Sequence, residues 1–284
     1  MSEPSATAGI DAVEIARLEE VARRIRVEVI RAVNHARAGH LGGPLSAADI
    51  LAVLYFHVMR IRPDEPRWPD RDRFVLSKGH SSIGLYAAMA LRGYFPVEEL
   101  STFDAAHSRL QGHPDMTRLP GLDMSSGSLG MGISAAMGMA LGARLTGRDS
   151  RAYVMLGDGE CQEGQIWEAA MAAAHFKLDN LTFILDHNGL QIDGSNDAVM
   201  GLGNIEAKFA AFGFECINVD GHDIAAIAAA LAVPSLGRPK FICCETIKGK
   251  GVSFMENNAG WHGKPINAEE RAKALAELGG TIDA

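Results

Sequence analysis

The residues that decide the fold occupy positions 152–194 and read AYVMLGDGECQEGQIWEAAMAAAHFKLDNLTFILDHNGLQIDG. The first five are apolar and break into Gly157-Asp158-Gly159, the pattern of a buried strand that ends in a tight turn. Residues 163–175 are rich in alanine, with apolar side chains at helical spacing, and a second apolar run at 181–185 ends in another polar turn. Strand, helix and strand together predict one parallel crossover unit, which is right-handed in nearly all proteins.

Both polar turns of this unit are expected at the carboxyl edge of the sheet, where open α/β folds bind ligands. Adjacent strands lie roughly 5 Å apart, so the side chains of Asp158 and Asn188 can reach one small cation. A carboxylate, an amide oxygen and a loop carbonyl are ligands for Mg²⁺ or Ca²⁺ rather than zinc. Mg²⁺ leaves positions for phosphate oxygens, and the helix after Gly159 offers free N–H groups to the same anion. The sequence therefore predicts a metal-diphosphate site.

The alternative is that Asp158 and Asn188 are only turn residues, since both types favour turns and a lone GDG is a weak motif. However, 28 residues separate Gly159 from Asn188, and they contain a legible helix and strand. The longer pattern GDGxxxEG…DxNGxxIDG, here GDGECQEG and DHNGLQIDG, resembles the transketolases, which are thiamine diphosphate enzymes. The resemblance implies cofactor contacts from Gly157, Asp158, Gly159 and Asn188, and a Mg²⁺ (or Ca²⁺) held by Asp158, Asn188 and the Leu190 carbonyl.

The length of the chain and its alternating strands and helices predict the architecture. With 284 residues, the chain can bury a substantial core, and it contains no internal repeat and no linker. We expect a single α/β domain over residues 1–284, a three-layer sandwich with a mostly parallel sheet, in which residues 1–9 are loose. The resemblance implies the thiamine-diphosphate-binding (PP-type) fold.

Composition restricts the possible partners. The net charge is −8 without a long basic cluster, so nucleic acid or membrane binding is not expected as a main role. The first residues are polar and acidic, unlike a signal peptide, and no run approaches a membrane span. The four cysteines lack metal or redox spacing and are expected to be reduced, with Cys243 and Cys244 on opposite faces of a strand. These features predict a cytoplasmic protein.

Two further helices flank the glycine-rich loops before the central unit. Residues 11–37 form an amphipathic pattern that stops at the loop GHLGGP, after which we expect Ser46 to cap a second helix. Residues 126–145 begin with SGSLGMG and continue as a run of small residues. We expect this segment to form a helix suited to tight packing.

Five of the ten histidines lie beside a glycine, which lets the backbone approach a ligand closely. They are His40, His80, His113, His222 and His262. The alternative for each one is a loop histidine bonded to the backbone. We expect the DGHD turn to be structural, with the residue after His222 as a helix N-cap.

The resemblance gives the other four histidines specific roles. GHLGGP resembles the GHPG loop of the family, which implies that His40 lies over the substrate near the reactive carbon of the cofactor. SKGH resembles SNGH and implies a cofactor-side His80 near the diphosphate. GHPD resembles GHPE, so His113 is expected at the substrate mouth, in proton transfer or hydroxyl binding. WHG resembles a late HG element, which implies that His262 contacts diphosphate and substrate.

The loop SGSLGMG resembles the TGPLGQG loop of the family, which lies along the cofactor. The residues that match it are Gly127, Ser128, Leu129 and Gly130. Glu163 resembles a family glutamate at the subunit interface, and we include it among the cofactor-side residues. Its alternative is a first-turn glutamate favoured by the helix dipole. Three departures from the family pattern affect substrate contacts: Ser128 replaces proline, Met131 replaces glutamine and Leu41 replaces proline.

The resemblance covers nearly the whole chain but only the amino-terminal half of a full transketolase. The other half of the family supplies the glutamate that activates the aminopyrimidine ring, its aromatic wall and most substrate-phosphate ligands. The chain therefore resembles the first subunit of a split transketolase, which implies a carboxyl-terminal partner subunit in an α₂β₂ assembly. Such an enzyme transfers a two-carbon ketol unit from a ketose (phosphate) to an aldose (phosphate), with His40, His113 and His262 as the catalytic residues.

Two other interpretations stay open at this point. One is the first half of a related thiamine diphosphate enzyme, a deoxyxylulose-phosphate synthase or a 2-oxo-acid dehydrogenase component. The motifs around the histidines favour transketolase over the dehydrogenase. The other is a catalytically idle paralogue that binds the cofactor and acts as a regulatory partner, against which the retained Asp158, Asn188 and histidines argue.

Overall fold

A computed structural model of the chain describes residues 10–280, and its centre is a five-stranded sheet. All four strand pairs are parallel, and the strand order is β1-β2-β3-β5-β4. The parallel sheet and the central crossover unit are as predicted from the sequence. The strands are β1 (Arg73–Leu76), β2 (Ala152–Gly157), β3 (Leu181–His187), β4 (Glu215–Asp220) and β5 (Lys240–Glu245).

Alternate residues of each strand enter two separate hydrophobic cores, one on each face of the sheet. Tyr153 and Met155 of β2 join the first core, whereas Val154 lies in the second. Cys244 and Cys243 divide in the same way, as expected of neighbours on a strand. None of the four cysteines, all of which lie within residues 10–280, forms a disulfide.

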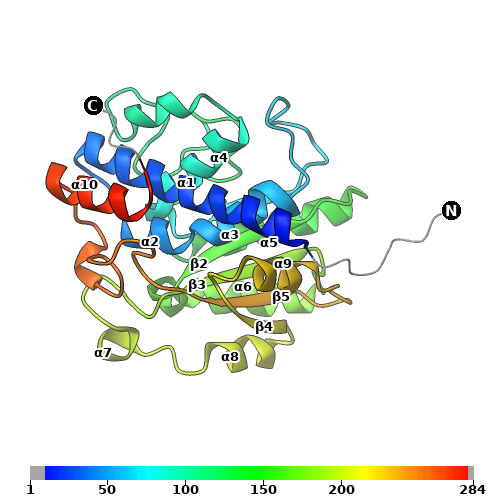
Figure 1. Cartoon of the computed structure of the whole chain (residues 1–284). Helices are drawn as coiled ribbons and strands as arrows, with labels where there is room; N and C mark the ends of the chain where they lie inside the picture. Colours follow the sequence, from blue (N-terminus) through cyan, green and yellow to red (C-terminus); the bar gives the residue numbers. More distant parts are fainter. Residues whose placement is uncertain (1–9, 281–284) are drawn as a thin grey trace.

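The first core is covered by the long amphipathic helix α1 and by shorter helices that pack around it (Figure 1). The Asp11 side chain caps α1 by accepting the Glu14 N–H. The helices on this face are α1 (Ala12–Ala36), α2 (Gly42–Ser46), α3 (Ala48–Val53), the π-helical turn η1 (Leu54–Val58), α4 (Ser82–Arg92), η3 (Val97–Thr102), α9 (Ile224–Ala232) and α10 (Ala268–Glu277).

The second core lies between the other face of the sheet and three helices: α5 (Met131–Leu145), α6 (Gly164–His175) and α8 (Ile205–Phe212). Short turns connect these elements near the strand ends: η2 (Gly79–Ser81), η4 (Gly159–Gln162), α7 (Asn196–Met200) and η5 (Ala259–Trp261). Helices therefore cover both faces of the sheet, which is the predicted three-layer arrangement.

Two sequence-based expectations about helix starts are wrong. Ser46 does not cap a helix, because α2 already begins at Gly42 and Ser46 is its last residue. Its hydroxyl donates instead to the buried Asp186. The helix of small residues begins at Met131 rather than at residue 126, because residues 126–130 form an irregular loop.

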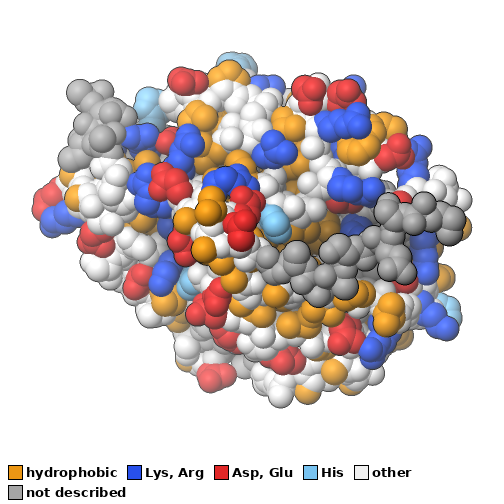
Figure 2. Space-filling view, turned by 45° about the vertical axis from the view of Figure 1, so that its right-hand side comes forward, with side chains coloured by type: hydrophobic (Ala, Val, Ile, Leu, Met, Phe, Trp, Pro, Cys, Tyr) orange, Lys and Arg blue, Asp and Glu red, His pale blue; other side chains and the backbone are white. Residues whose placement is uncertain are grey.

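Two features of residues 10–280 concern membrane and nucleic acid binding: the length and apolarity of the helices, and the charges on one face. No helix in this part of the chain combines the length and the apolarity that a membrane crossing requires. On the face drawn in Figure 2, lysine and arginine side chains lie among aspartate and glutamate side chains. This face therefore does not present a continuous basic surface.

Candidate active site

A cavity of about 400 Å³ lies at the carboxyl ends of β1, β2 and β3. The loops after these strands are Ser77-Lys78, Asp158-Gly159 and Asn188-Gly189, and the loop after β5 brings Lys248 to the same place. Of the residues predicted for the site, those that line the cavity are His40, His80, Gly127, Leu129, Gly157, Asp158, Gly159, Glu163, Asn188, Leu190 and His262.

The two carboxylate oxygens of Asp158, the predicted metal ligand, have different surroundings. One carboxylate oxygen, Oδ2, accepts hydrogen bonds from the backbone N–H groups of Asn188 and Gly189, both at 3.0 Å. The other oxygen, Oδ1, is buried and makes no hydrogen bond among residues 10–280, and His187 Nε2 lies 3.5 Å from it. Burial raises the pKa of Asp158 to about 6. An unpartnered buried carboxylate oxygen is rare in folded proteins, and a bound cation would satisfy it.

Asn188 and Leu190, the other two predicted ligands, line the same cavity as Asp158. The Asn188 Oδ1 atom accepts the Leu190 N–H at 3.2 Å and keeps a second lone pair. The donor set is thus a carboxylate, an amide oxygen and a backbone carbonyl, which fits Mg²⁺ or Ca²⁺.

Lys78, which lines the cavity, belongs to a buried ion pair that the motifs did not reveal. The Lys78 ammonium group pairs with Asp186, and both side chains are almost fully buried. Asp186 also accepts from Ser46 and Thr246, while Lys78 also donates to the Gly43 carbonyl. Burial alone would raise the pKa of Asp186, but the Lys78 ammonium and these hydrogen bonds hold it below its ordinary value.

The first glycine of the GDG turn makes room for this lysine. A Cβ atom at Gly157 would lie 3.3 Å from Lys78 Cδ, closer than ordinary van der Waals contact. The lysine stem therefore passes over the end of β2 on its way from β1 to β3. A larger residue at position 157 would therefore press on the Lys78 stem.

Glu160, which sequence reasoning treated as a spacer inside GDGECQEG, connects three loops of the site. Its carboxylate accepts from the Gly130 N–H at 2.9 Å, from the Gly157 N–H at 3.2 Å and from the Ser77 hydroxyl. The side chain is almost fully buried, and burial raises its pKa. Glu160 therefore fixes the cofactor loop against the ends of β1 and β2.

Four histidines predicted for the site converge around His40. Its ring centroid lies 5.2 Å from that of His80, 5.3 Å from that of His262 and 6.3 Å from that of His113. The rings of His80 and His262 are 4.9 Å apart. The predicted loops thus bring together side chains that are up to 222 positions apart in the chain (40 to 262).

Burial keeps three of these rings neutral. It lowers the pKa of His80 to about 2, with a further contribution from the Lys78 ammonium, and that of His262 to about 3, helped by Lys248. The pKa of His40 is also lowered, first by burial. Lys248 Nζ lies 2.9 Å from His262 Nδ1, so Nδ1 accepts and the ring proton belongs on Nε2. Burial in turn lowers the pKa of Lys248 to about 8.

The remaining predicted residues lie at the margin of the site or outside it. His113 is exposed and lines a second, outer cavity, which it shares with His40. Ser128 is exposed, and the Gly130 N–H donates to Glu160. Neither residue lines the inner cavity. Glu163 is exposed at the start of α6 and makes no capping hydrogen bond.

His222 has the structural position that the DGHD turn predicts. Its Nδ1 lies 2.7 Å from Asp49 Oδ2, and its Nε2 accepts the Ile247 N–H at 2.8 Å. Asp223 caps α9 through the Ala226 N–H. The ring therefore connects three elements of the fold and lies apart from the four histidines of the site.

The functional residues that sequence reasoning missed are Lys78, Glu160, Asp186 and Lys248. Lys78 and Glu160 lie inside the motifs SKGH and GDGECQEG. The sequence signal for a role in the site was a charged residue in the turn after a predicted strand. Lys248 begins KGKG directly after β5, where a lysine at the carboxyl edge of the sheet points to an anion. Asp186 ends an apolar run, and its burial could be predicted only if Lys78 were known to be its partner.

These features define a class of protein: an α/β domain with a cavity at the carboxyl edge of a parallel sheet, lined by candidate ligands for a cation and a diphosphate. The family is transketolase, since residues 18–283 match the model of the transketolase, thiamine diphosphate binding domain, and the chain belongs to this family. This agrees with the family, fold and cofactor predicted from the sequence.

Named relatives cover the chain along almost its whole length. It is 44% identical over 263 residues to a 6-deoxy-6-sulfo-D-fructose transketolase subunit of Clostridium sp. (strain MSTE9), covering 92% of this chain and 96% of the relative. It is 38% identical over 272 residues to an apulose-4-phosphate transketolase subunit of Phocaeicola vulgatus, covering 95% and 96%. These relatives are subunits of similar length, which supports the interpretation as one subunit of a split enzyme.

A solved transketolase of Pichia stipitis in complex with xylulose 5-phosphate has the same fold, with a TM-score of 0.89 and 32% sequence identity. The alignment covers 94% of this chain but 41% of that one. The chain therefore spans about two fifths of this longer transketolase.

Proposed function

We propose that this chain is the diphosphate-binding subunit of a two-subunit transketolase that moves a two-carbon ketol unit from a ketose to an aldose, with phosphorylated sugars as candidate substrates. The observation that supports it best is the buried Asp158 Oδ1, which has no hydrogen-bond partner among residues 10–280 at the predicted metal position. When bound, thiamine diphosphate supplies the electron sink that such a transfer requires.

The residues present fit a Mg²⁺-diphosphate group. Asp158, Asn188 and the Leu190 carbonyl would hold the cation. Lys248 and His80 line the same cavity and offer a positive charge and a ring N–H to the phosphate oxygens. The Lys78 ammonium is already paired with Asp186, so its charge is largely neutralised and Lys248 is the stronger candidate for the diphosphate.

The histidines on the substrate side are suited to hydroxyl groups. A neutral imidazole has one donor and one acceptor nitrogen, which is the pair that a sugar hydroxyl requires. His40 lines both the inner and the outer cavity, so it can contact a substrate that enters from the outer one. His113 stands at that opening and His262 deeper inside. We assign proton transfer and hydroxyl binding to these three residues.

The site is proposed to be completed by a second subunit that holds the pyrimidine part of the cofactor, in an α₂β₂ assembly. Large apolar side chains are exposed on α5, on α6 and at the residue after α6, where a partner could cover them: Met131, Leu145, Met171 and Phe176. The free thiols of Cys161, Cys243 and Cys244 suit a reducing compartment, and we place the enzyme in the cytoplasm.

The test is to purify this chain alone and together with the carboxyl-terminal transketolase subunit of the same genome. Ketol transfer from a ketose phosphate should be undetectable with either chain and restored by mixing them. Size-exclusion chromatography with light scattering then gives the stoichiometry. Full activity of the lone chain would contradict the two-subunit proposal, and cofactor binding without transfer in the mixture would favour the idle paralogue.

A further inference from the structure

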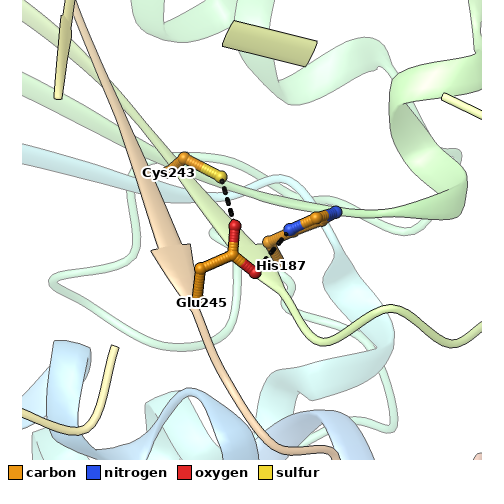
Figure 3. A group of neighbouring side chains, drawn as sticks. All are labelled: His187, Cys243 and Glu245. Carbon is orange, nitrogen blue, oxygen red and sulfur yellow. Dashed lines mark hydrogen bonds and ion pairs between the residues drawn. The ribbon is translucent and has the colours of Figure 1, made fainter. Parts of the chain in front are cut away.

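Three side chains of different chemistry meet at the carboxyl ends of β3 and β5, beside the cavity (Figure 3). His187 and Glu245 are cross-strand partners, and Cys243 lies two positions before Glu245 on β5. His187 Nδ1 is 2.8 Å from Glu245 Oε2, and the Cys243 thiol donates to Glu245 Oε1 at 3.6 Å. The glutamate therefore lies between the other two, as Figure 3 shows.

The three donor atoms lie within 4.8 Å of one another. A tetrahedral zinc ion binds nitrogen, oxygen and sulfur at about 2.0–2.3 Å, which separates its ligand atoms by roughly 3.3–3.8 Å. Small side-chain rotations would bring the present atoms to these separations. The Glu245 side chain is 51% exposed whereas Cys243 is buried behind it, so a cation can approach from the solvent side when Glu245 rotates.

We propose that His187, Cys243 and Glu245 form a second metal site, for a divalent cation of the zinc type with one coordination position left for water. A thiolate and an imidazole favour zinc or cobalt over Mg²⁺, which separates this site from the hard-oxygen site at Asp158. On binding, the Cys243 thiol releases its proton to solvent while His187 binds as the neutral ring. The charges of the thiolate, the carboxylate and the cation then sum to zero.

The surroundings supply the outer contacts that metal ligands usually have. His187 Nε2 lies 3.5 Å from Asp158 Oδ1, so a cation on Nδ1 would leave the Nε2–H facing a carboxylate. The Asn218 amide donates to Glu245 Oε1 at 3.3 Å and also to Glu206, which orients the glutamate. Without a cation, burial raises the pKa of the Cys243 thiol, which explains why it stays protonated and bonds to Glu245.

The proposal can be tested on the whole chain, independently of transketolase activity. The chain is stripped with a chelator and saturated with Mg²⁺, which occupies the hard-oxygen site, and Co²⁺ is then titrated. We expect one equivalent to produce the near-ultraviolet thiolate-to-cobalt absorption band, and Zn²⁺ to abolish it by competition. Absence of a thiolate band at saturating Co²⁺ would overturn the proposal.

Substitutions of single residues test which side chains bind the metal. Cys243→Ser should abolish the band, and Glu245→Gln, at a half-exposed position, should weaken Co²⁺ binding by roughly 10–100-fold. Cys216→Ser is the matched control, because this partly buried thiol lies on neighbouring β4 and should leave the band unchanged. A band that survives Cys243→Ser, or that disappears in Cys216→Ser, would overturn the assignment. If Cys243→Ser fails to fold, an unchanged Co²⁺ affinity of the Glu245→Gln variant would also overturn the assignment.

Discussion

Lys78 and Asp186, 108 positions apart in the chain, form a buried ion pair between the ends of β1 and β3. Asp186 precedes the predicted metal ligand Asn188 by two positions in the chain, so we expect this charge contact to influence the position of that ligand. Isolated buried charges are costly, and each partner is stabilised chiefly by the other.

Lys78→Met should therefore destabilise the fold by about 3–5 kcal/mol, the usual cost of leaving one buried charge unpaired. Urea unfolding of the isolated chain measures this loss. The double variant Lys78→Met/Asp186→Asn removes both charges and should recover part of the stability. If the two substitutions were additive, the ion pair would contribute no coupling energy.

Asp158→Asn should abolish Mg²⁺-dependent binding of thiamine diphosphate in the assembled enzyme without loss of the fold. The asparagine oxygen can still accept the two N–H groups of residues 188 and 189, but its NH₂ group would face the cation. Calorimetric titration and cofactor circular dichroism measure the change. Asp193→Asn is the matched control, since Asp193 lines the same cavity but is exposed. Undiminished cofactor affinity in Asp158→Asn would show that Asp158 is only a turn residue.

Glu160→Gln should lower the free energy of unfolding by about 1–3 kcal/mol, because one of the buried donors around the carboxylate then meets an amide donor. Glu163→Gln, three residues later and exposed, should change stability by less than about 0.5 kcal/mol. Denaturant unfolding of both variants gives the comparison. Equal effects would mean that the contacts of Glu160 do not hold the three loops together.

The neutral histidines predict how stability depends on pH in the cofactor-free chain. The pKa of His80 is about 2 and that of His262 about 3 in the folded chain, against an ordinary value of 6.5. Between these values the unfolded chain binds more protons, so stability falls as pH falls below about 6.5. His80→Asn should make the stability curve flatter between pH 6.5 and pH 4. An identical slope in this variant and in the wild type would contradict the burial argument.

His40→Ala and His113→Ala should each reduce ketol transfer by roughly 10²-fold, the ordinary loss for a positioned acid–base or substrate contact. Cofactor affinity in the assembled enzyme should stay unchanged, because we assign both residues to substrate rather than to the cofactor. His35→Ala, at the exposed end of α1, is the control for loss of a histidine. Parallel loss of cofactor and activity in either variant would place that residue at the cofactor instead.

The parts of the fold that could be predicted from the sequence are those with local signals. Apolar runs that end in GDG and in Asp-His-Asn-Gly mark the crossover unit, and glycine-flanked histidines mark the loops of the site. The structure brings His40, His80 and His262 together, although His40 lies in the loop between α1 and α2 and the other two lie after strands.

The contacts that could not be predicted depend on pairing across long distances. Ser46 precedes an apolar run and has the pattern of a helix cap, but its hydroxyl bonds to a residue 140 positions away. From the sequence alone, Lys78 resembles an exposed charged residue. Its burial can be predicted only when β1 and β3 are known to flank β2. The strand order also lacks a local signal, because β5 enters the sheet between β3 and β4 although it follows both in the chain.

That strand order has a consequence for synthesis on the ribosome. Until residues 240–245 emerge, the apolar β3 has one unpaired edge and β4 has no partner in the sheet. Unpaired strand edges and exposed apolar surface promote association of incomplete chains. A polypeptide that terminates between residues 188 and 239 should therefore aggregate and require chaperones. The five-stranded sheet can be completed only when nearly all of the residues that build the site have been synthesised.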